Sequence, residues 1–234
     1  MSRVLARIRA ALGVRGDAPA RRRAVQERLR RHPRGPLPGW ATADRETLLA
    51  AFRARLEANR ATVARVPDEN AAVAAVRAWL THHDLPLEAV VAAGLAALDW
   101  APLRIETRPP GPDDRVGIAI ADLGIAETGS LVFFSAPDAP ITLAFVPETH
   151  IVLVPAGRVA GPMEAIWAHQ RARFPNLPPR SVTLVSGPSR TADIEQTIEF
   201  GAHGPKRLHV VIIEAQSSPS VARWASAGAS AERS

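Results

Sequence analysis

The sequence predicts an α/β fold built around a largely parallel β-sheet. Short apolar runs typical of buried strands alternate with amphipathic helical segments between about residues 62 and 213. Apolar residues make up 47% of the 234 residues, which is enough to bury a sizeable core. No apolar run approaches the roughly 18 residues that a membrane-spanning helix needs, so we expect none.

The N-terminal part is predicted to be helical and strongly basic. Helices are expected at 2–12 and 20–31, followed by a linker at 32–39 that holds three prolines and two glycines. Residues 1–65 contain 16 arginines and 5 acidic residues, whereas the remainder has 13 basic and 18 acidic residues. The basic character therefore belongs to the N-terminal part, either as a solvated helical surface or as a surface for nucleic acid or an acidic partner.

The predicted organisation is a basic helical arm over 1–40, an α/β domain over 41–214 and a flexible tail over 215–234. In the domain, one helix is expected from Thr42 or Asp44 to about residue 60, and another from Asp68 to about residue 82. Further helices are predicted at 161–172 and 191–199, and 116–123 is predicted as strand or loop. Strands are predicted at 62–66, 89–93, 103–107, 130–135, 141–146, 150–155, 182–185 and 208–213. The three strands between 130 and 155 have no helix between them, which predicts an antiparallel unit inserted in the parallel sheet.

A first candidate for chemistry lies in the turn Ala126-Glu-Thr-Gly-Ser130. The turn places the Glu127 carboxylate directly before an apolar strand, where a carboxylate with a tuned pKa can act as a base or nucleophile. The alternative is structural, with Glu127 capping the turn or pairing with an arginine. Asp122 is either its partner or a loop acid.

A second candidate is the turn Gly187-Pro-Ser-Arg190, which follows an apolar strand and precedes the helix predicted at 191–199. The side chains of Ser189, Arg190 and Thr191 could donate hydrogen bonds to a phosphate or carboxylate at a helix N-terminus.

Three residues argue against a simple phosphate loop. Pro188 has no N–H to donate, and Asp193 and Glu195 in the first helical turn already interact with the helix dipole. Arg190 could instead pair with Asp193 or Glu127 in a structural ion pair.

The remaining polar candidates are a carboxylate pair and a histidine. Glu195 and Glu199 are four residues apart and would share a helix face, as a solvated surface or around a cation. His203 lies in the tight turn Gly201-Ala-His-Gly-Pro205 before the last strand, where it could donate to a ligand or to the backbone. No spacing of histidines and carboxylates predicts a metal site.

Four motifs together resemble the LUD-domain family, and within it the lactate utilization protein C type, also called LutC or YkgG-like. They are Ala126-Glu-Thr-Gly-Ser130, the strand entry Pro147-x-x-His150, Gly187-Pro-Ser-Arg-Thr-Ala-Asp-Ile-Glu195 and Gly201-x-His-Gly-Pro205. The resemblance is dense from about 117 to 213. It implies a NagB/RpiA/CoA-transferase-like α/β fold with a mostly parallel sheet flanked by helices.

The resemblance also implies a role in oxidising L-lactate to pyruvate, alongside iron–sulfur partners of the LutA and LutB type. The chain contains no cysteine, so we expect the clusters in those partners and no cofactor here. The family resemblance assigns no catalytic mechanism, but several residues of this chain match positions in the family motifs. Glu127 is the candidate catalytic residue, and the candidate ligand-binding residues are Gly187, Ser189, Arg190, Thr191, Asp193, Glu195 and His203.

One segment departs from the family pattern, because 135–140 lacks the basic residue expected before the next apolar strand. Two other functions remain open, a self-sufficient enzyme that uses Glu127 and a nucleic-acid-binding regulator that uses the arm. Residues 1–65 contain only Trp40 and Phe52 as aromatic residues, which disfavours binding single strands by base stacking. We expect a cytoplasmic protein, because residues 1–9 lack the apolar region of a secretory signal, and a homo-oligomer is compatible with the sequence.

Overall fold

The computed structural model describes residues 3–13, 19–136, 139–192, 198–200 and 204–214. The contacts divide the chain after Pro36 into an N-terminal part and a larger C-terminal part. The tail predicted at 215–234 lies outside the described residues.

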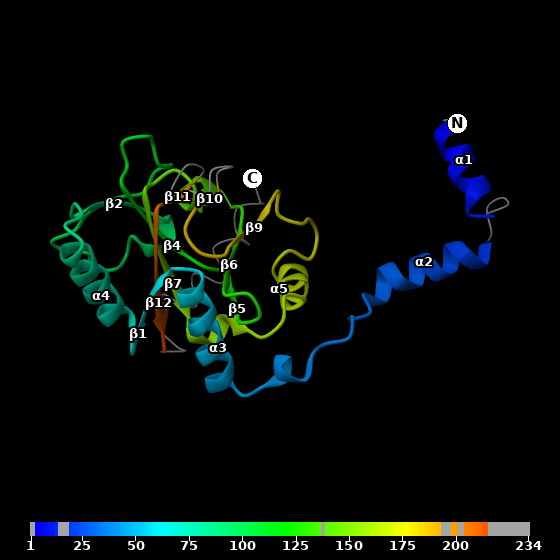
Figure 1. Cartoon of the computed structure of the whole chain (residues 1–234), viewed down its shortest axis with the longest axis horizontal. Helices are drawn as coiled ribbons and strands as arrows, with labels where there is room; N and C mark the ends of the chain where they lie inside the picture. Colours follow the sequence, from blue (N-terminus) through cyan, green and yellow to red (C-terminus); the bar gives the residue numbers. More distant parts are fainter. Residues whose placement is uncertain (1–2, 14–18, 137–138, 193–197, 201–203, 215–234) are drawn as a thin grey trace. The chain divides into compact units, whose positions relative to one another are not determined.

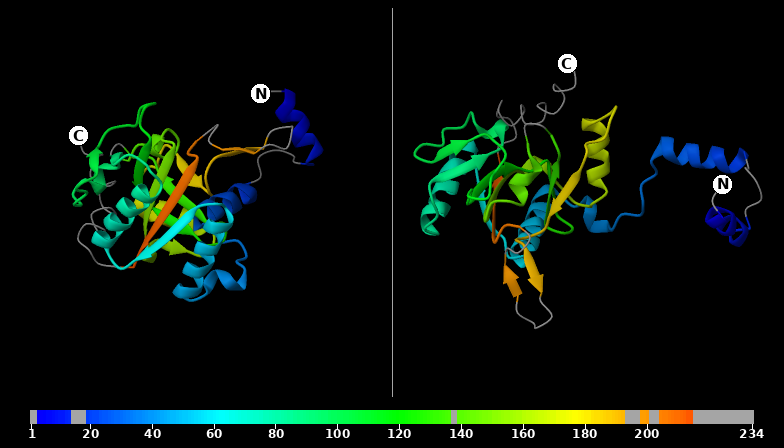
Figure 2. Two further views of the ribbon diagram at one scale, coloured as in Figure 1. Left: turned by 60° about the vertical axis from the view of Figure 1, so that its left-hand side comes forward. Right: turned by 90° about the horizontal axis from the view of Figure 1, so that it is seen from above.

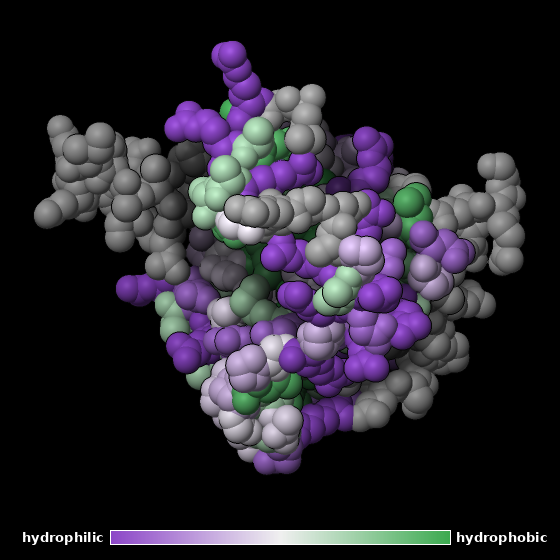
Figure 3. Space-filling model, turned by 90° about the vertical axis from the view of Figure 1, so that its right-hand side faces the viewer, coloured by the Kyte–Doolittle hydropathy of each residue, from purple (hydrophilic) through white to green (hydrophobic). Residues whose placement is uncertain are grey.

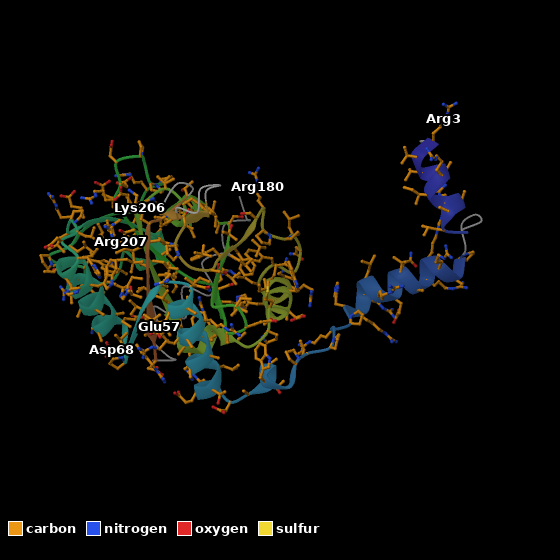
Figure 4. All side chains as sticks on the ribbon, in the orientation of Figure 1. Arg3, Glu57, Asp68, Arg180, Lys206 and Arg207 are labelled. Carbon is orange, nitrogen blue, oxygen red and sulfur yellow. The ribbon has the colours of Figure 1, made fainter. Side chains whose placement is uncertain are left out.

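The N-terminal part contains the two predicted helices, α1 (Arg3–Ala11) and α2 (Pro19–Arg31). None of their residues is buried, and Arg3 extends outward from α1 in Figure 4. Val4, Leu5 and Ile8 of α1 are also exposed, so this helix has an apolar stripe beside its arginines. The predicted helical extension is thus confirmed.

The C-terminal part is organised around a six-stranded sheet in which every pair of neighbouring strands is parallel. The spatial order is β1-β12-β7-β4-β2-β3, so β7 and β4 occupy the centre. The strands are β1 (Thr62–Val66), β2 (Glu88–Val91), β3 (Arg104–Glu106), β4 (Val116–Ile120), β7 (Thr149–Pro155) and β12 (Arg207–Ile213). The predicted α/β class with a parallel sheet is confirmed.

A second, mixed sheet has the order β8-β5-β6-β9. Strand β6 pairs antiparallel with β5 and β9, whereas β5 pairs parallel with β8. Its strands are β5 (Leu123–Ile125), β6 (Ser130–Phe134), β8 (Val159–Ala160) and β9 (Val182–Val185). Two further strands, β10 (Arg190–Ala192) and β11 (Ile198–Phe200), pair with each other and lie beyond the sheets in the right-hand view of Figure 2.

The two sheets pack face to face, with one helix on each outer side (Figure 1). On the inner side, the Phe133 ring of β6 lies 5.6 Å from the His150 ring of β7. On the outer side of the parallel sheet, Trp79 of α4 (Glu69–His82) stacks on His209 of β12 at 4.7 Å. On the outer side of the mixed sheet, Phe134 packs against α5 (Ala165–Arg173). The family resemblance implied a mostly parallel sheet flanked by helices; the structure contains these helices and adds the second, mixed sheet against the inner face.

Side-chain caps fix the starts of the two predicted domain helices. Asp44 accepts a hydrogen bond from the Thr47 N–H at the start of α3 (Arg45–Ala58), and Asp68 accepts one from the Ala71 N–H at the start of α4. Both predicted caps are confirmed. Short 3₁₀ helices form at η1 (Gly39–Thr42), η2 (Ala93–Leu95), η3 (Ile141–Ala144) and η4 (Ala156–Arg158).

Three sequence predictions about elements were wrong. The segment 141–146 was predicted as a strand but forms η3, because its apolar pattern reflects burial of Leu143 and Ala144 and not pairing. The helix predicted at 191–199 is wrong at both described ends, which form β10 and β11; Glu199 lies in strand β11, and Glu195 lies outside the described residues.

The predicted antiparallel insertion in the parallel sheet is also absent from the described residues. Strand β6 belongs to the second sheet, whereas β7 joins the parallel sheet beside β4. The helix predicted at 161–172 begins later, at Ala165.

The described residues include no helix that is both long and apolar enough to cross a membrane. The face of the molecule in Figure 3 is mostly hydrophilic, with apolar side chains exposed only in small, separate areas.

His150 is fully buried in the central strand β7, and neither of its ring nitrogens has a hydrogen-bond partner. Burial lowers its pKa from 6.5 to about 3, because the charged imidazolium would lose its hydration. The ring is therefore neutral in the folded protein at ordinary pH.

We predict that His150 makes the fold acid-sensitive. Between pH 6.5 and about 3 the unfolded chain binds a proton at this site that the folded chain does not, so the free energy of unfolding falls as the pH falls. The slope contributed is up to about 1.4 kcal/mol per pH unit. Urea unfolding of a His150→Leu variant between pH 7.5 and 4.5 should show a shallower dependence on pH. The same change at the exposed His82 is the control, and an unchanged slope in His150→Leu would contradict the prediction.

Candidate functional site

Two of the motif turns meet at the C-terminal end of helix α3. The Asn59 Nδ2 donates to the Thr128 carbonyl oxygen at 3.1 Å, and Gly187 lies against the Asn59 backbone. A line of hydroxyl groups joins the same segments, with 2.6 Å from Thr128 Oγ1 to Ser130 Oγ and 2.6 Å from Ser130 Oγ to Ser186 Oγ. These contacts join the turn at 126–130 to the turn that follows β9.

A third motif segment adjoins the second. The Ser189 N–H donates to the Pro205 carbonyl oxygen at 2.8 Å, which places the start of the 187–195 motif beside the end of the 201–205 motif. Of the other predicted ligand-binding residues, Arg190 and Thr191 lie in β10. The remaining ones, Asp193, Glu195 and His203, lie outside the described residues.

Glu127 is half-buried, and its carboxylate has a structural contact. Its Oε2 accepts a hydrogen bond from the Met163 N–H at 3.0 Å, and its own N–H donates to the Gly161 carbonyl oxygen at 3.0 Å. Glu127 thus joins the end of β5 to the segment that leads into α5.

A small, partly open cavity lies elsewhere, at the carboxyl ends of the parallel strands β2 and β4. Its volume is about 60 Å³. Open α/β sheets bind ligands at this edge, because the loops that follow the strands converge there. The lining residues come from the loops after β2, β4 and β7, from β6, η3 and α5: Ala92, Gly94, Ala119, Ile120, Asp122, Phe133, Phe134, Ala139, Pro140, Ile141, Leu143, Ala144, Arg158 and Arg173.

Asp122 is held at the wall of this cavity by contacts from two elements, β6 and α5. Its Oδ2 accepts a hydrogen bond from the Phe134 N–H at 2.7 Å, and its own N–H donates to the Val132 carbonyl oxygen at 2.8 Å. Its Oδ1 forms an ion pair with Arg173 Nη1 of α5. The sequence suggested Glu127 as the partner of Asp122, but the structure pairs it with Arg173.

Two partly buried arginines, Arg158 and Arg173, contribute positive charge to the cavity lining. Burial lowers the pKa of both Arg158 and Arg173, but a guanidinium remains protonated in proteins. The Arg173 Nε is buried and has no hydrogen-bond partner, although its Nη1 is paired with Asp122. A buried guanidinium N–H without an acceptor is costly, so this group is available to an anion that enters the cavity.

His169 of α5 lies behind the cavity wall and stacks on Phe134 with ring centroids 5.9 Å apart. Burial lowers its pKa first, and the positive charge of Arg158 lowers it further. A neutral His169 therefore adds no charge beside the two arginines.

The cavity lining also contains apolar side chains, among them Ala119, Ile120, Phe133 and Leu143. A lining that combines guanidinium groups with hydrocarbon suits a small ligand that has an anionic group and an apolar group. Among the residues that the structure describes, no group of three or more His, Asp or Glu side chains is arranged to hold a metal ion.

Sequence reasoning missed Arg158 and Arg173. The chain has 29 Lys and Arg residues, and no local pattern distinguishes the two that the fold buries. The available signal was positional, because Arg158 follows the central strand β7 by three residues and such positions line sites in parallel sheets.

Comparison with known proteins identifies the domain. Residues 104–213, which include Asp122, Arg158 and Arg173, match the LUD domain family. The chain carries a LUD domain. The predicted family is thus confirmed.

Curated relatives match a shorter stretch of the chain. Lactate utilization protein C of Geobacillus kaustophilus is 34% identical over 100 residues, covering 42% of each chain. The uncharacterized protein NMB1437 of Neisseria meningitidis is 39% identical over 97 residues, covering 42% of this chain and 41% of the relative. The uncharacterized protein YkgG of Escherichia coli is 33% identical over 123 residues, covering 50% and 52%. The chain therefore spans about half or less of the length of the curated relatives it matches.

The fold also has a counterpart among solved structures. A DUF162 family protein from Deinococcus radiodurans superposes with a TM-score of 0.57 at 22% identity, covering 73% of this chain and 99% of that one. This likeness shows that the α/β arrangement is shared.

We predict that Gly187 is required for stability at the junction of the motif turns. Its φ is +93°, and a Cβ there would lie 2.4 Å from the Asn59 carbonyl oxygen. A Gly187→Ala variant should lose at least about 2 kcal/mol of unfolding free energy in urea titrations, from strain and displacement of the Asn59 backbone.

Gly157→Ala is the matched control, because a Cβ at Gly157 meets no atom within 4 Å. Its unfolding free energy should change by less than about 0.5 kcal/mol. Equal stabilities of the two variants would contradict the account of Gly187.

Proposed function

We propose that the chain acts as a lactate utilization protein C-like subunit in the oxidation of L-lactate to pyruvate. The observation that carries the proposal is the LUD domain at 104–213 together with relatives named lactate utilization protein C. Because the aligned segments cover only 42% of those relatives, the activity of the whole relative is a proposal for this chain.

The reaction removes two electrons and two protons from lactate, with one hydrogen from the carbon that bears the hydroxyl group and the other from the hydroxyl oxygen, and gives pyruvate. Electron acceptors are needed, and iron–sulfur clusters in LutA- and LutB-like partner proteins would supply them. The chain has no cysteine, the residue that usually ligates such clusters, so we place the clusters in the partners and no cofactor in this chain. A cytoplasmic location is part of the same proposal.

We further propose that the domain is a variant of the NagB/RpiA/CoA-transferase-like fold. The all-parallel six-stranded sheet supports this proposal, as does the cavity at the carboxyl ends of its strands. The four-stranded mixed sheet over one face would be its distinctive addition.

Glu127 as a catalytic base, in a self-sufficient enzyme, stays a prediction. The hydrogen bond from the Met163 N–H to its carboxylate favours a structural role, as does its position outside the cavity lining. The ligand-binding roles expected for the 187–195 and 201–205 motifs also remain proposals, and so do homo-oligomer formation and nucleic-acid binding by the arm.

Deleting the gene tests the proposed pathway. We expect the deletion strain to stop growing on L-lactate as the carbon source and to grow normally on pyruvate. Expression of the chain from a plasmid should restore growth on lactate. Unchanged growth on lactate, with no second copy of the gene present, would refute the proposed function.

A Glu127→Gln variant separates the two roles of Glu127. The Gln amide oxygen can still accept from the Met163 N–H but cannot act as a base, so a structural role predicts full complementation of the deletion strain. A Glu127→Ala variant removes the acceptor and should lower the melting temperature. Loss of growth with a normally folded Glu127→Gln protein would instead assign Glu127 a catalytic role.

A further inference from the structure

We propose that the cavity beside Asp122, Arg158 and Arg173 binds the carboxylate of a small organic monoacid of two or three carbons. Binding of this ligand class is inferred from the geometry of the cavity. Only the choice of lactate or pyruvate as the natural ligand rests on the proposed function.

The position of the cavity favours a ligand site over a packing defect. It opens where the loops after β2, β4 and β7 converge, and residues from the second sheet and from α5 complete the wall. With residues 139–144 of the η3 segment, six separate chain segments contribute to a single space, and the edge of the sheet is the one that α/β proteins use for ligands.

The polar residues of the cavity lining supply hydrogen-bond donors suited to an anion. Arg173 offers a buried Nε–H that has no protein acceptor, and its ion pair with Asp122 holds the guanidinium in place. Asp122 is in turn fixed by the Phe134 N–H. Arg158 places a second guanidinium on the same cavity, and guanidinium groups match the planar geometry of a carboxylate.

Size and polarity restrict the ligand further. Each water needs roughly 10–15 Å³ of such a volume, so a cavity of about 60 Å³ holds a handful of non-hydrogen atoms. The apolar lining residues include Ile120, Phe133 and Leu143, which suit a methyl group and not a second charge. The Asp122 carboxylate would also repel a dianion more strongly than a monoanion. Acetate, lactate and pyruvate fit these limits better than phosphate.

The binding test uses the full chain and measures its melting temperature and its calorimetric titration at constant ionic strength. Acetate, pyruvate and L-lactate at millimolar concentrations should raise the melting temperature relative to sodium chloride, as expected for ligands that bind only the folded state. Lactamide, which lacks the carboxylate, and phosphate should give no such increase. A response to chloride equal to that of the acids would mean general anion screening, and would overturn the proposal.

Three arginine variants localise the site. Arg158→Met removes one guanidinium and should weaken acid binding at least about tenfold. Arg173→Lys keeps a positive charge for Asp122 but removes the Nε–H, and should weaken binding by a similar factor. Arg171→Met changes an exposed arginine of the same helix and should leave binding unchanged.

Several outcomes would overturn the proposal. They are the absence of a melting-temperature increase with any of the three acids, or equal affinities in the wild type, Arg158→Met and Arg173→Lys. If the arginine variants unfold, the contrast between L-lactate and lactamide in the wild type still decides the matter. Acid binding combined with normal growth of the deletion strain on lactate would refute the proposed function and leave the binding site standing.

Discussion

The packing of strand β6 between two layers determines where the cavity lies. All five residues of β6 are buried, and its adjacent phenylalanines point in opposite directions. Phe133 packs towards His150 of the parallel sheet, whereas Phe134 packs towards α5. This arrangement brings Arg173 of α5 to the edge of the parallel sheet, because the Phe134 N–H also fixes its partner Asp122. Sheet packing and the ion pair therefore depend on the same strand.

The family motifs and the cavity have separate positions in the domain. Contacts of Thr128, Ser186 and Gly187 tie the motif turns to Asn59 at the end of α3. These contacts give Thr128, Ser186 and Gly187 a structural role in the turns, and that role does not depend on a bound ligand. The described cavity uses other residues of the same LUD domain, so a motif that identifies the family need not mark the place where a small molecule binds.

The sequence predicted correctly the elements that depend on interactions between residues close together in the chain. Asp44 and Asp68 are side-chain caps, and each requires only a few neighbouring residues to act. The failures involve contacts between distant residues. The sequence at 191–199 resembled a helix, but its described ends, Arg190–Ala192 and Ile198–Phe200, form the paired strands β10 and β11. Likewise, the apolar run at 141–146 resembled a strand. A short apolar run indicates that residues are buried, but it does not indicate whether they pair in a sheet.

The position of the site could be predicted only in part. A parallel sheet indicates that the carboxyl ends of its strands carry the site, but the sequence identified Asp122 only as a partner of Glu127 or a loop acid. Its pairing with Arg173 depends on how α5 packs over the mixed sheet, and that sheet was not predicted. The residues that neighbour Arg158 and Arg173 in the sequence do not distinguish these two from the other arginines of the chain. Burial of a charged side chain depends on the tertiary fold.

The central claim is that the fold holds a buried guanidinium ready for a small carboxylate. The most direct measurement is the NMR signal of the Arg173 Nε–H in the full chain, assigned by its loss in Arg173→Lys and followed during titration with acetate. The account predicts a saturable shift of this signal, with the same affinity that calorimetry gives and without a comparable change for exposed Arg171. A signal that stays unchanged while acetate binds, or that responds equally to chloride, would contradict it.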